Sequence, residues 1–268
     1  MHRRSAVLAL TLLNLAGGSA AAATTFSITL NYTGEPKYLP LFQSAKSTWE
    51  NLIPSYIDGV QGVELFPGIL INASIGVMDG PGGILGGAGP TFGGYDNSGF
   101  LLATEGDMEF DMADVGWLGG ALDTVILHEM GHVIGLGTLW TWNGFYVDGS
   151  GQYTGANGLA AYRTEFNQPD AAFVPVELGG GGGTAGGHWN EVDVGARLTG
   201  LVSNVSGQDM AYELMTGWLN LGQPYFISNL TRGSLRDLGY NVVPEPSAAA
   251  LGFVILAGLG LTRRRRVS

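Results

Sequence analysis

The stretch His128-Glu129-Met130-Gly131-His132 decides how the rest of the chain is interpreted. Apolar residues recur on both sides of it at helical spacing, and Gly135 follows as a residue that accepts the left-handed conformation closing a last helical turn. Residues four apart on a helix share one face, with Cβ atoms roughly 5–6 Å apart. The sequence therefore predicts a helix on which His128 and His132 face one metal ion, with Glu129 beside them.

The small number of histidines indicates which residue is the third metal ligand. A catalytic zinc ion usually takes three protein ligands and keeps its fourth position for water. The chain has four histidines, and His2 lies in a segment that is not expected in the mature protein, so His188 is the remaining candidate. It follows the glycines of residues 179–183 and 186–187, which give the backbone the freedom to return over the helix. A solvated histidine that binds no metal is the alternative.

This ligand set predicts hydrolytic chemistry. Zinc lowers the pKa of a bound water, and a carboxylate in the place of Glu129 takes the proton as the water attacks a peptide carbonyl. The expected function is an exported zinc-dependent endopeptidase whose substrate is a protein or peptide. One alternative is a catalytically silent surface or matrix protein that uses zinc only to hold its fold. Another is a metallohydrolase that acts on a non-peptide bond.

The chain divides into three segments by composition. Residues 1–23 carry two arginines, an apolar stretch and a run of alanines, which is typical of a secretory signal peptide; an uncleaved anchor is the alternative. Residues 24–242 form the expected peptidase domain, with an N-terminal subdomain over about 24–137 and a C-terminal subdomain over 138–242. The chain has no cysteine, so this exported body must be held by its core, to which bound cations are a candidate addition.

Acidic residues outnumber basic ones, 23 to 12, and the formal net charge is −11. Nucleic-acid binding is excluded on that balance, whereas calcium binding or attraction for basic substrates fits it. Just ahead of the histidine motif, Asp111 and Asp114 are the candidate calcium ligands, together with Glu109. Acidic turn residues exposed to solvent are the alternative.

The regular elements expected around the motif are those of an α+β layer. Alternating apolar residues predict strands over residues 24–33 and 68–78, and helical spacing predicts a helix over 41–53, closed by Pro54. A last helix is expected over 228–238. The glycine-rich residues 79–99 have two readings: a sheet edge that pairs with an extended peptide substrate, or a flexible surface loop.

Several motifs together resemble those of a known family. The run from His128 to Trp140, the residues ending at His188-Trp189 and the stretch Glu213-Leu214-Met215-Thr216-Gly217 resemble bacterial members of the leishmanolysin-like family of the metzincin clan, over about residues 106–240. The resemblance implies a twisted N-terminal sheet with helices and a less regular C-terminal subdomain across an active-site cleft. It also implies the site residues: the zinc ligands His128, His132 and His188, the general base Glu129, and Met215 in the turn beneath the metal. A methionine that merely fills the core is the alternative for Met215.

Residues 243–268 form a separate terminal segment. Val243-Pro244-Glu245-Pro246 precedes an apolar stretch over 248–261 and four arginines over 263–266. This segment resembles a PEP-CTERM sorting signal, which implies an exosortase-type sorting enzyme as a partner and membrane contact before processing. The implied location, after export across the inner membrane, is the cell surface or extracellular matrix of a Gram-negative bacterium. A plain C-terminal membrane anchor is the alternative.

Overall fold

The computed structural model describes the body of the chain, at residues 25–57, 60–61, 64–65, 68–82, 84–191, 197–220 and 222–244. The expected signal peptide at 1–23 lies outside the described residues, as does the sorting segment apart from Val243 and Pro244. No helix in the described ranges has the length and apolar character needed to cross a membrane.

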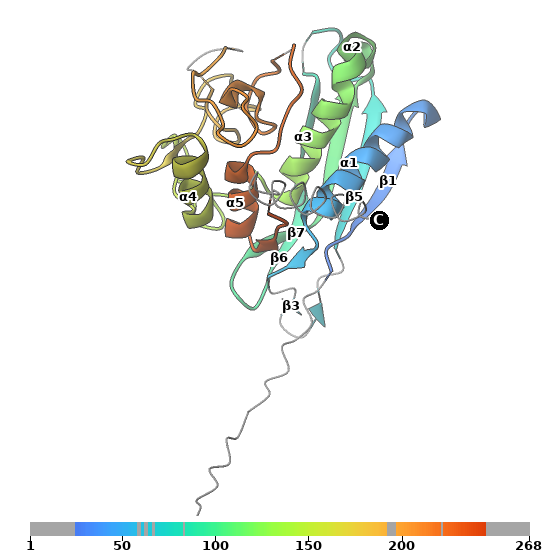
Figure 1. The fold of residues 1–268 in the computed structure, drawn as a ribbon. Helices are drawn as coiled ribbons and strands as arrows, with labels where there is room; N and C mark the ends of the chain where they lie inside the picture. Colours follow the sequence, from blue (N-terminus) through green and yellow to red (C-terminus); the bar gives the residue numbers. More distant parts are fainter. Residues whose placement is uncertain are drawn as a thin grey trace, which may run out of the picture.

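A four-stranded mixed sheet forms one half of the fold (Figure 1). Its order is β1 (Ile28–Thr33), β5 (Ile69–Gly76), β7 (Leu101–Asp111) and β6 (Gly86–Tyr95). The first three strands run parallel, and β6 pairs antiparallel with β7 at the edge of the sheet. The strands expected over 24–33 and 68–78 are confirmed as β1 and β5, and part of the glycine-rich stretch forms the edge strand β6 rather than a loop.

Two helices, α1 (Leu39–Leu52) and α3 (Leu122–Ile134), pack side by side over one face of this sheet (Figure 1). Helix α1 ends two residues before Pro54, close to the predicted bound. The indole Nε1 of Trp49 donates a hydrogen bond of 3.0 Å to the carbonyl oxygen of Leu127, which fixes α1 against α3. The core between helices and sheet is fully apolar at its centre, with Phe42, Ile71, Phe110, Ile126 and Val133 all buried.

The connection from the sheet to α3 is short. Strand β7 leads directly into α2 (Met112–Leu118) and the 3₁₀ turn η2 (Gly119–Ala121), after which α3 begins. Helix α3 ends at Ile134 and is followed by Gly135, whose φ of 123° is open only to glycine without strain. The helix predicted for the histidine motif, and its glycine end, are therefore confirmed.

The rest of the chain has less regular structure. It contains α4 (Ala156–Glu165) and α5 (Asn229–Asp237), which pack together, the strand pair β8 (Gln152–Tyr153) and β9 (Val174–Pro175), and the 3₁₀ turn η3 (Met210–Tyr212). Helix α5 is capped by Ser228 and confirms the helix expected over 228–238. Strand β10 (Tyr240–Asn241) pairs with β2 (Ser55–Tyr56), which ties the end of this half to the first half. The remaining elements are η1 (Pro36–Tyr38), β3 (Val60–Gln61) and β4 (Glu64–Leu65).

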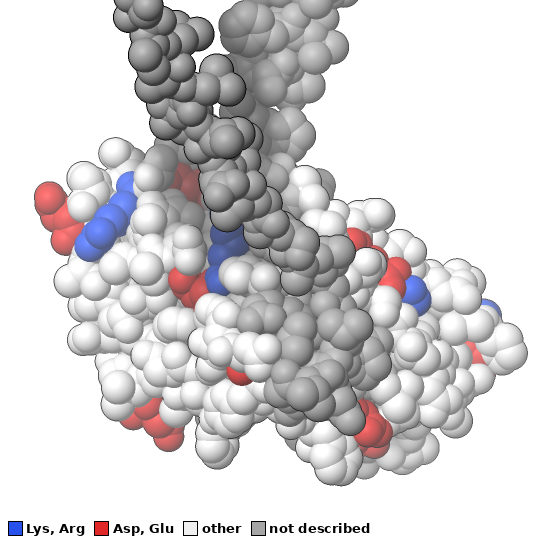
Figure 2. Space-filling view, turned by 90° about the horizontal axis from the view of Figure 1, so that it is seen from below, with Lys and Arg blue, Asp and Glu red and all other residues white. Residues whose placement is uncertain are grey.

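The described fold is thus a mixed α/β arrangement, compatible with the α+β class expected from the sequence. Charged side chains are sparse on its surface, in keeping with a charged fraction of 13% in the whole chain. On the face seen in Figure 2, acidic and basic side chains lie scattered among uncharged ones.

Candidate metal centre

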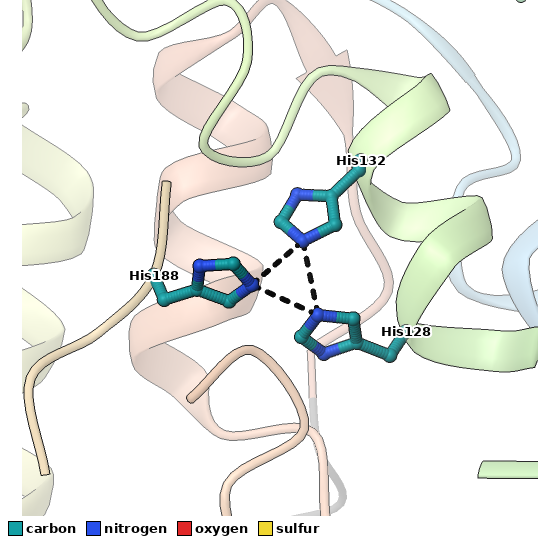
Figure 3. A group of neighbouring side chains, drawn as sticks. All are labelled: His128, His132 and His188. Carbon is teal, nitrogen blue, oxygen red and sulfur yellow. Dashed lines mark hydrogen bonds between the residues drawn. The ribbon is translucent and has the colours of Figure 1, made fainter. Parts of the chain in front are cut away.

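Three histidine side chains point toward one another (Figure 3), and all three line one cavity. His128 and His132 lie one turn apart on α3, and His188 arrives from the glycine-rich segment that follows β9. Their Nε2 atoms form a nearly equilateral triangle, with separations of 2.9 Å, 2.9 Å and 3.0 Å. No other group of three or more His, Asp or Glu residues within the described ranges could hold a metal ion.

Main-chain carbonyl oxygens fix the orientation of all three rings. The Nδ1 of His128 lies 2.6 Å from the oxygen of Leu214, that of His132 lies 2.8 Å from Leu136, and that of His188 lies 2.8 Å from Thr184. A carbonyl oxygen only accepts, so each Nδ1 carries the proton and donates it. Each Nε2 then presents a bare lone pair to the other two.

This arrangement suits a cation. Burial lowers the pKa of His128, and it lowers the pKa of His132 further with help from the two neighbouring rings. Burial, and then the nearby His128, lower the pKa of His188 to about 3. Three neutral imidazoles that direct lone pairs at one another within 3.0 Å repel unless a positive charge lies among them. The donors therefore fit a single metal ion at an ordinary metal–nitrogen bond length of about 2.1 Å.

The path of the chain to His188 depends on a close backbone contact. Gly137, with φ of 77°, lies directly beneath Gly187, and a Cβ at residue 137 would overlap the carbonyl oxygen of Gly187. Beyond the histidine, the amide of Trp189 donates to the carbonyl oxygen of Met215 at 3.0 Å. The third histidine is thus held between the end of α3 and the segment around Met215.

Met215 lies beneath the histidine helix. Its side chain is fully buried, and a Cβ on Gly131 would come within 2.9 Å of the sulfur. The segment is anchored by the buried carboxylate of Glu213, which accepts hydrogen bonds from the Met215 amide at 2.6 Å, from Ser228 and from the Thr231 hydroxyl at 2.6 Å. Glu213 therefore fixes the backbone that carries the Leu214 oxygen to His128.

Glu129 lies on the same cavity wall as the histidines. The cavity has a volume of about 1070 Å³ and is bounded by α3, the start of β6, the segment over 180–188 and the segment over 214–219. Burial raises the pKa of Glu129 to about 7. A carboxyl group with such a pKa can accept a proton near neutral pH and release it again.

The expected calcium candidates do not join the histidines. Asp111 caps α2 and accepts hydrogen bonds from the amides of Ala113, Asp79 and Gly80, which hold its pKa below the ordinary value even though burial opposes them. Asp114 accepts from the amide of Gly82 at 2.7 Å. No third His, Asp or Glu in the described ranges lies within ligating distance of these two. Their carboxylates organise a loop, and calcium binding stays a prediction.

The sequence predicted roles for the three histidines, Glu129, Met215 and Gly135, but none for Glu213 or Asp148. Glu213 stands two residues before Met215, within the stretch Glu213–Gly217 that resembles the family, and this position is the sequence signal that could have identified it. Asp148 lines the cavity but has no neighbouring pattern that marks it. Comparison of the chain with protein-family models and with curated proteins finds no match.

Proposed function

We propose that this protein is an exported zinc-dependent endopeptidase in which His128, His132 and His188 hold the metal and Glu129 is the general base. The observation that carries the proposal is the position of Glu129 on the wall of the same cavity as the three ligands. A metal site that only stabilises a fold is usually closed by protein ligands on every side. Here three nitrogen donors and an adjacent carboxylate face open space.

Zinc is the metal that best suits these donors. Three imidazoles with a free further position are a known catalytic zinc set, and nitrogen ligands favour zinc over magnesium or calcium. Zinc, when bound, polarises water and the carbonyl of the substrate.

The side chains of the protein supply the proton transfers and the positioning. Glu129 accepts a proton from the water that attacks the scissile carbonyl and returns it to the departing amine. Burial disfavours the charged carboxylate of Glu129 and so favours its taking up that proton. The three carbonyl oxygens that accept from the Nδ1 atoms keep the imidazole lone pairs directed at one point throughout.

The edge strand β6 provides a means of aligning a peptide. Its first residues, Gly86, Gly87 and Ala88, line the cavity, and it has no sheet partner on that side among the described residues. An extended peptide can add to such an edge through main-chain hydrogen bonds. The small side chains leave room for this approach.

The scaffold proposed here is that of the metzincin clan, in its leishmanolysin-like branch. The buried Met215 beneath the histidine helix agrees with the methionine-bearing turn of the clan. The wide separation of His132 from His188 is similar to the leishmanolysin-like arrangement, in which an insertion separates the second and third histidines. The proposal also includes the path of the protein out of the cell. The segment at 1–23 directs export, an exosortase-type enzyme acts on the sorting segment at 243–268, and the protein then resides at the cell surface or in the matrix.

The test compares the wild-type protein with Glu129→Ala in casein cleavage and in metal content. We expect Glu129→Ala to keep zinc and to lose activity by roughly 10²–10⁴-fold. Phenanthroline should abolish wild-type cleavage, and added zinc should restore it. Glu35→Ala is the matched control, because Glu35 is exposed on the surface and pairs with Lys37 at 2.8 Å.

Two results would replace this proposal. Undiminished cleavage by Glu129→Ala would remove the general base from the mechanism. A wild-type protein that holds zinc but cleaves no protein or peptide would favour the silent binding protein, or a hydrolase of another bond if a substrate screen finds one.

A further inference from the structure

The charged groups of the catalytic cleft are all acidic. Two carboxylates line the cavity, those of Glu129 and Asp148, and no lysine or arginine does. Asp148 is exposed, and in the described part of the chain it has neither a hydrogen bond nor an ion pair. Glu129 is assigned to proton transfer, which leaves Asp148 as a negative charge with no structural task.

Asp148 lies at a defined end of the cleft. A Cβ on Gly186 would lie 3.6 Å from the Tyr146 ring and 3.8 Å from Oδ1 of Asp148. Gly187, the next residue, contacts Gly137 just beyond the C-terminal end of α3. Asp148 is therefore on the side where α3 ends, whereas Thr124 and Val125 line the cavity near the start of α3.

The direction of β6 relates these two ends to the direction of a bound peptide. Strand β6 begins beside the end of β7, from which the chain continues through α2 to the start of α3. It then runs toward the C-terminal end of α3, where a Cβ on Gly89 would lie 3.9 Å from Thr138 (Figure 1). A peptide added antiparallel, the slightly more stable pairing, runs the opposite way. Its N-terminal half then lies at the Asp148 end.

We infer that Asp148 recognises a lysine or arginine side chain on the N-terminal side of the scissile bond, an inference that rests on the proposed peptidase function. A cationic side chain there forms a charge-assisted pair with an otherwise unpaired carboxylate. The neighbouring residues 182, 183 and 186 are glycines, so no side chain of theirs competes for the space. The net charge of −11 draws basic segments toward the protein as a whole.

The experiment uses two quenched fluorescent peptides that differ only in Arg or Gln at one position N-terminal to the cleaved bond, chosen from a library profile of the full zinc-loaded protein. We expect kcat/KM to favour the Arg peptide by roughly three- to tenfold, as for an ion pair in a partly desolvated cleft. Asp148→Asn should bring the ratio close to one, and Asp148→Lys, which repels the Arg side chain, should reverse it in favour of the Gln peptide. Asp123→Asn is the matched control, because Asp123 lines an adjoining groove at the start of α3, at the end of the cleft away from Asp148, and should leave the ratio as it is.

A binding measurement separates this inference from the proposed function. The zinc-loaded Glu129→Ala variant should bind the Arg peptide more tightly than the Gln peptide by a similar factor, and Asp148→Asn should remove that difference. Two results would overturn the inference and leave the proposed peptidase function standing. The first is cleavage that depends on Glu129 but shows no preference for the Arg peptide, and the second is a preference for basic residues on the C-terminal side of the scissile bond instead. Charge-dependent binding with no cleavage would overturn the peptidase and keep the acidic subsite. Neither cleavage nor charge-dependent binding would overturn both.

Discussion

Replacing Gly137 by alanine should detach the third histidine from the metal centre. A Cβ at this position overlaps the carbonyl oxygen of Gly187 and lies 2.8 Å from its carbonyl carbon, whereas an ordinary contact is 3.4 Å or longer. The backbone of residue 187 must then retreat by roughly 0.6 Å or more, which exceeds the tolerance of about 0.2 Å in metal–ligand distances. His188 is the next residue, so we expect the affinity for zinc to fall at least tenfold, the scale of losses from disturbed ligand support.

The control for this prediction is Gly144→Ala. Gly144 has the same φ of 77°, but nothing lies within 4 Å of its Cβ position. Both substitutions therefore carry the backbone strain of a left-handed alanine, roughly 1–2 kcal/mol. This strain by itself should lower the melting temperature of the two variants by a similar amount. Only Gly137→Ala should also lose zinc in competition with a chelator. Equal zinc affinities in the two variants, within about threefold, would refute the role assigned to the contact between residues 137 and 187.

Three further predictions concern the stability of the fold. Met215→Ala should lower the free energy of unfolding by about 2–5 kcal/mol because it leaves a cavity, and Met215→Leu by less than about 1.5 kcal/mol; urea unfolding distinguishes the two. Burial raises the pKa of Glu191 from 4.5 to about 7, so between these values the folded state binds more protons than the unfolded state and stability falls as pH rises. The wild-type protein should therefore lose up to about 3 kcal/mol relative to Glu191→Gln between pH 4.5 and 7.5, and a constant difference between them would contradict this. Finally, zinc at 1,000 times its dissociation constant should add about 4 kcal/mol to the stability of the zinc-free protein, and His188→Ala should respond far less in a thermal titration.

The metal centre was predictable from the sequence to the extent that its signals are local or compositional. His128 and His132 are four residues apart, and helical geometry alone puts them on one face. His188 was identified because so few histidines were available, because glycines precede it, and because the residues ending at His188-Trp189 resemble a family motif; no local spacing places it near the helix. The carbonyl oxygens of Leu136, Thr184 and Leu214 could not be predicted, since a main-chain acceptor has no distinctive residue type.

Elements that depend on distant partners were also beyond the sequence. Helix α4 contains Gly158 in its first turn, which weakens its helical pattern. Its first amides are instead capped by Asp237 at the far end of α5, which accepts hydrogen bonds of 2.8 Å from the amides of Asn157 and Gly158. The strand β6 likewise forms from glycines without strand preference, because β7 provides a hydrogen-bonding partner.

The use of peptide carbonyls to orient the three imidazoles has a consequence for how this chain can change over generations. Every amino acid, proline included, carries that oxygen, so replacements at positions 136, 184 and 214 leave the acceptors in place as long as the backbone keeps its course. Tolerance at these positions should exceed that of centres oriented by carboxylate side chains, where a single exchange deletes the acceptor. The walls of the cleft are then free to diverge while the geometry of the ligands is inherited unchanged.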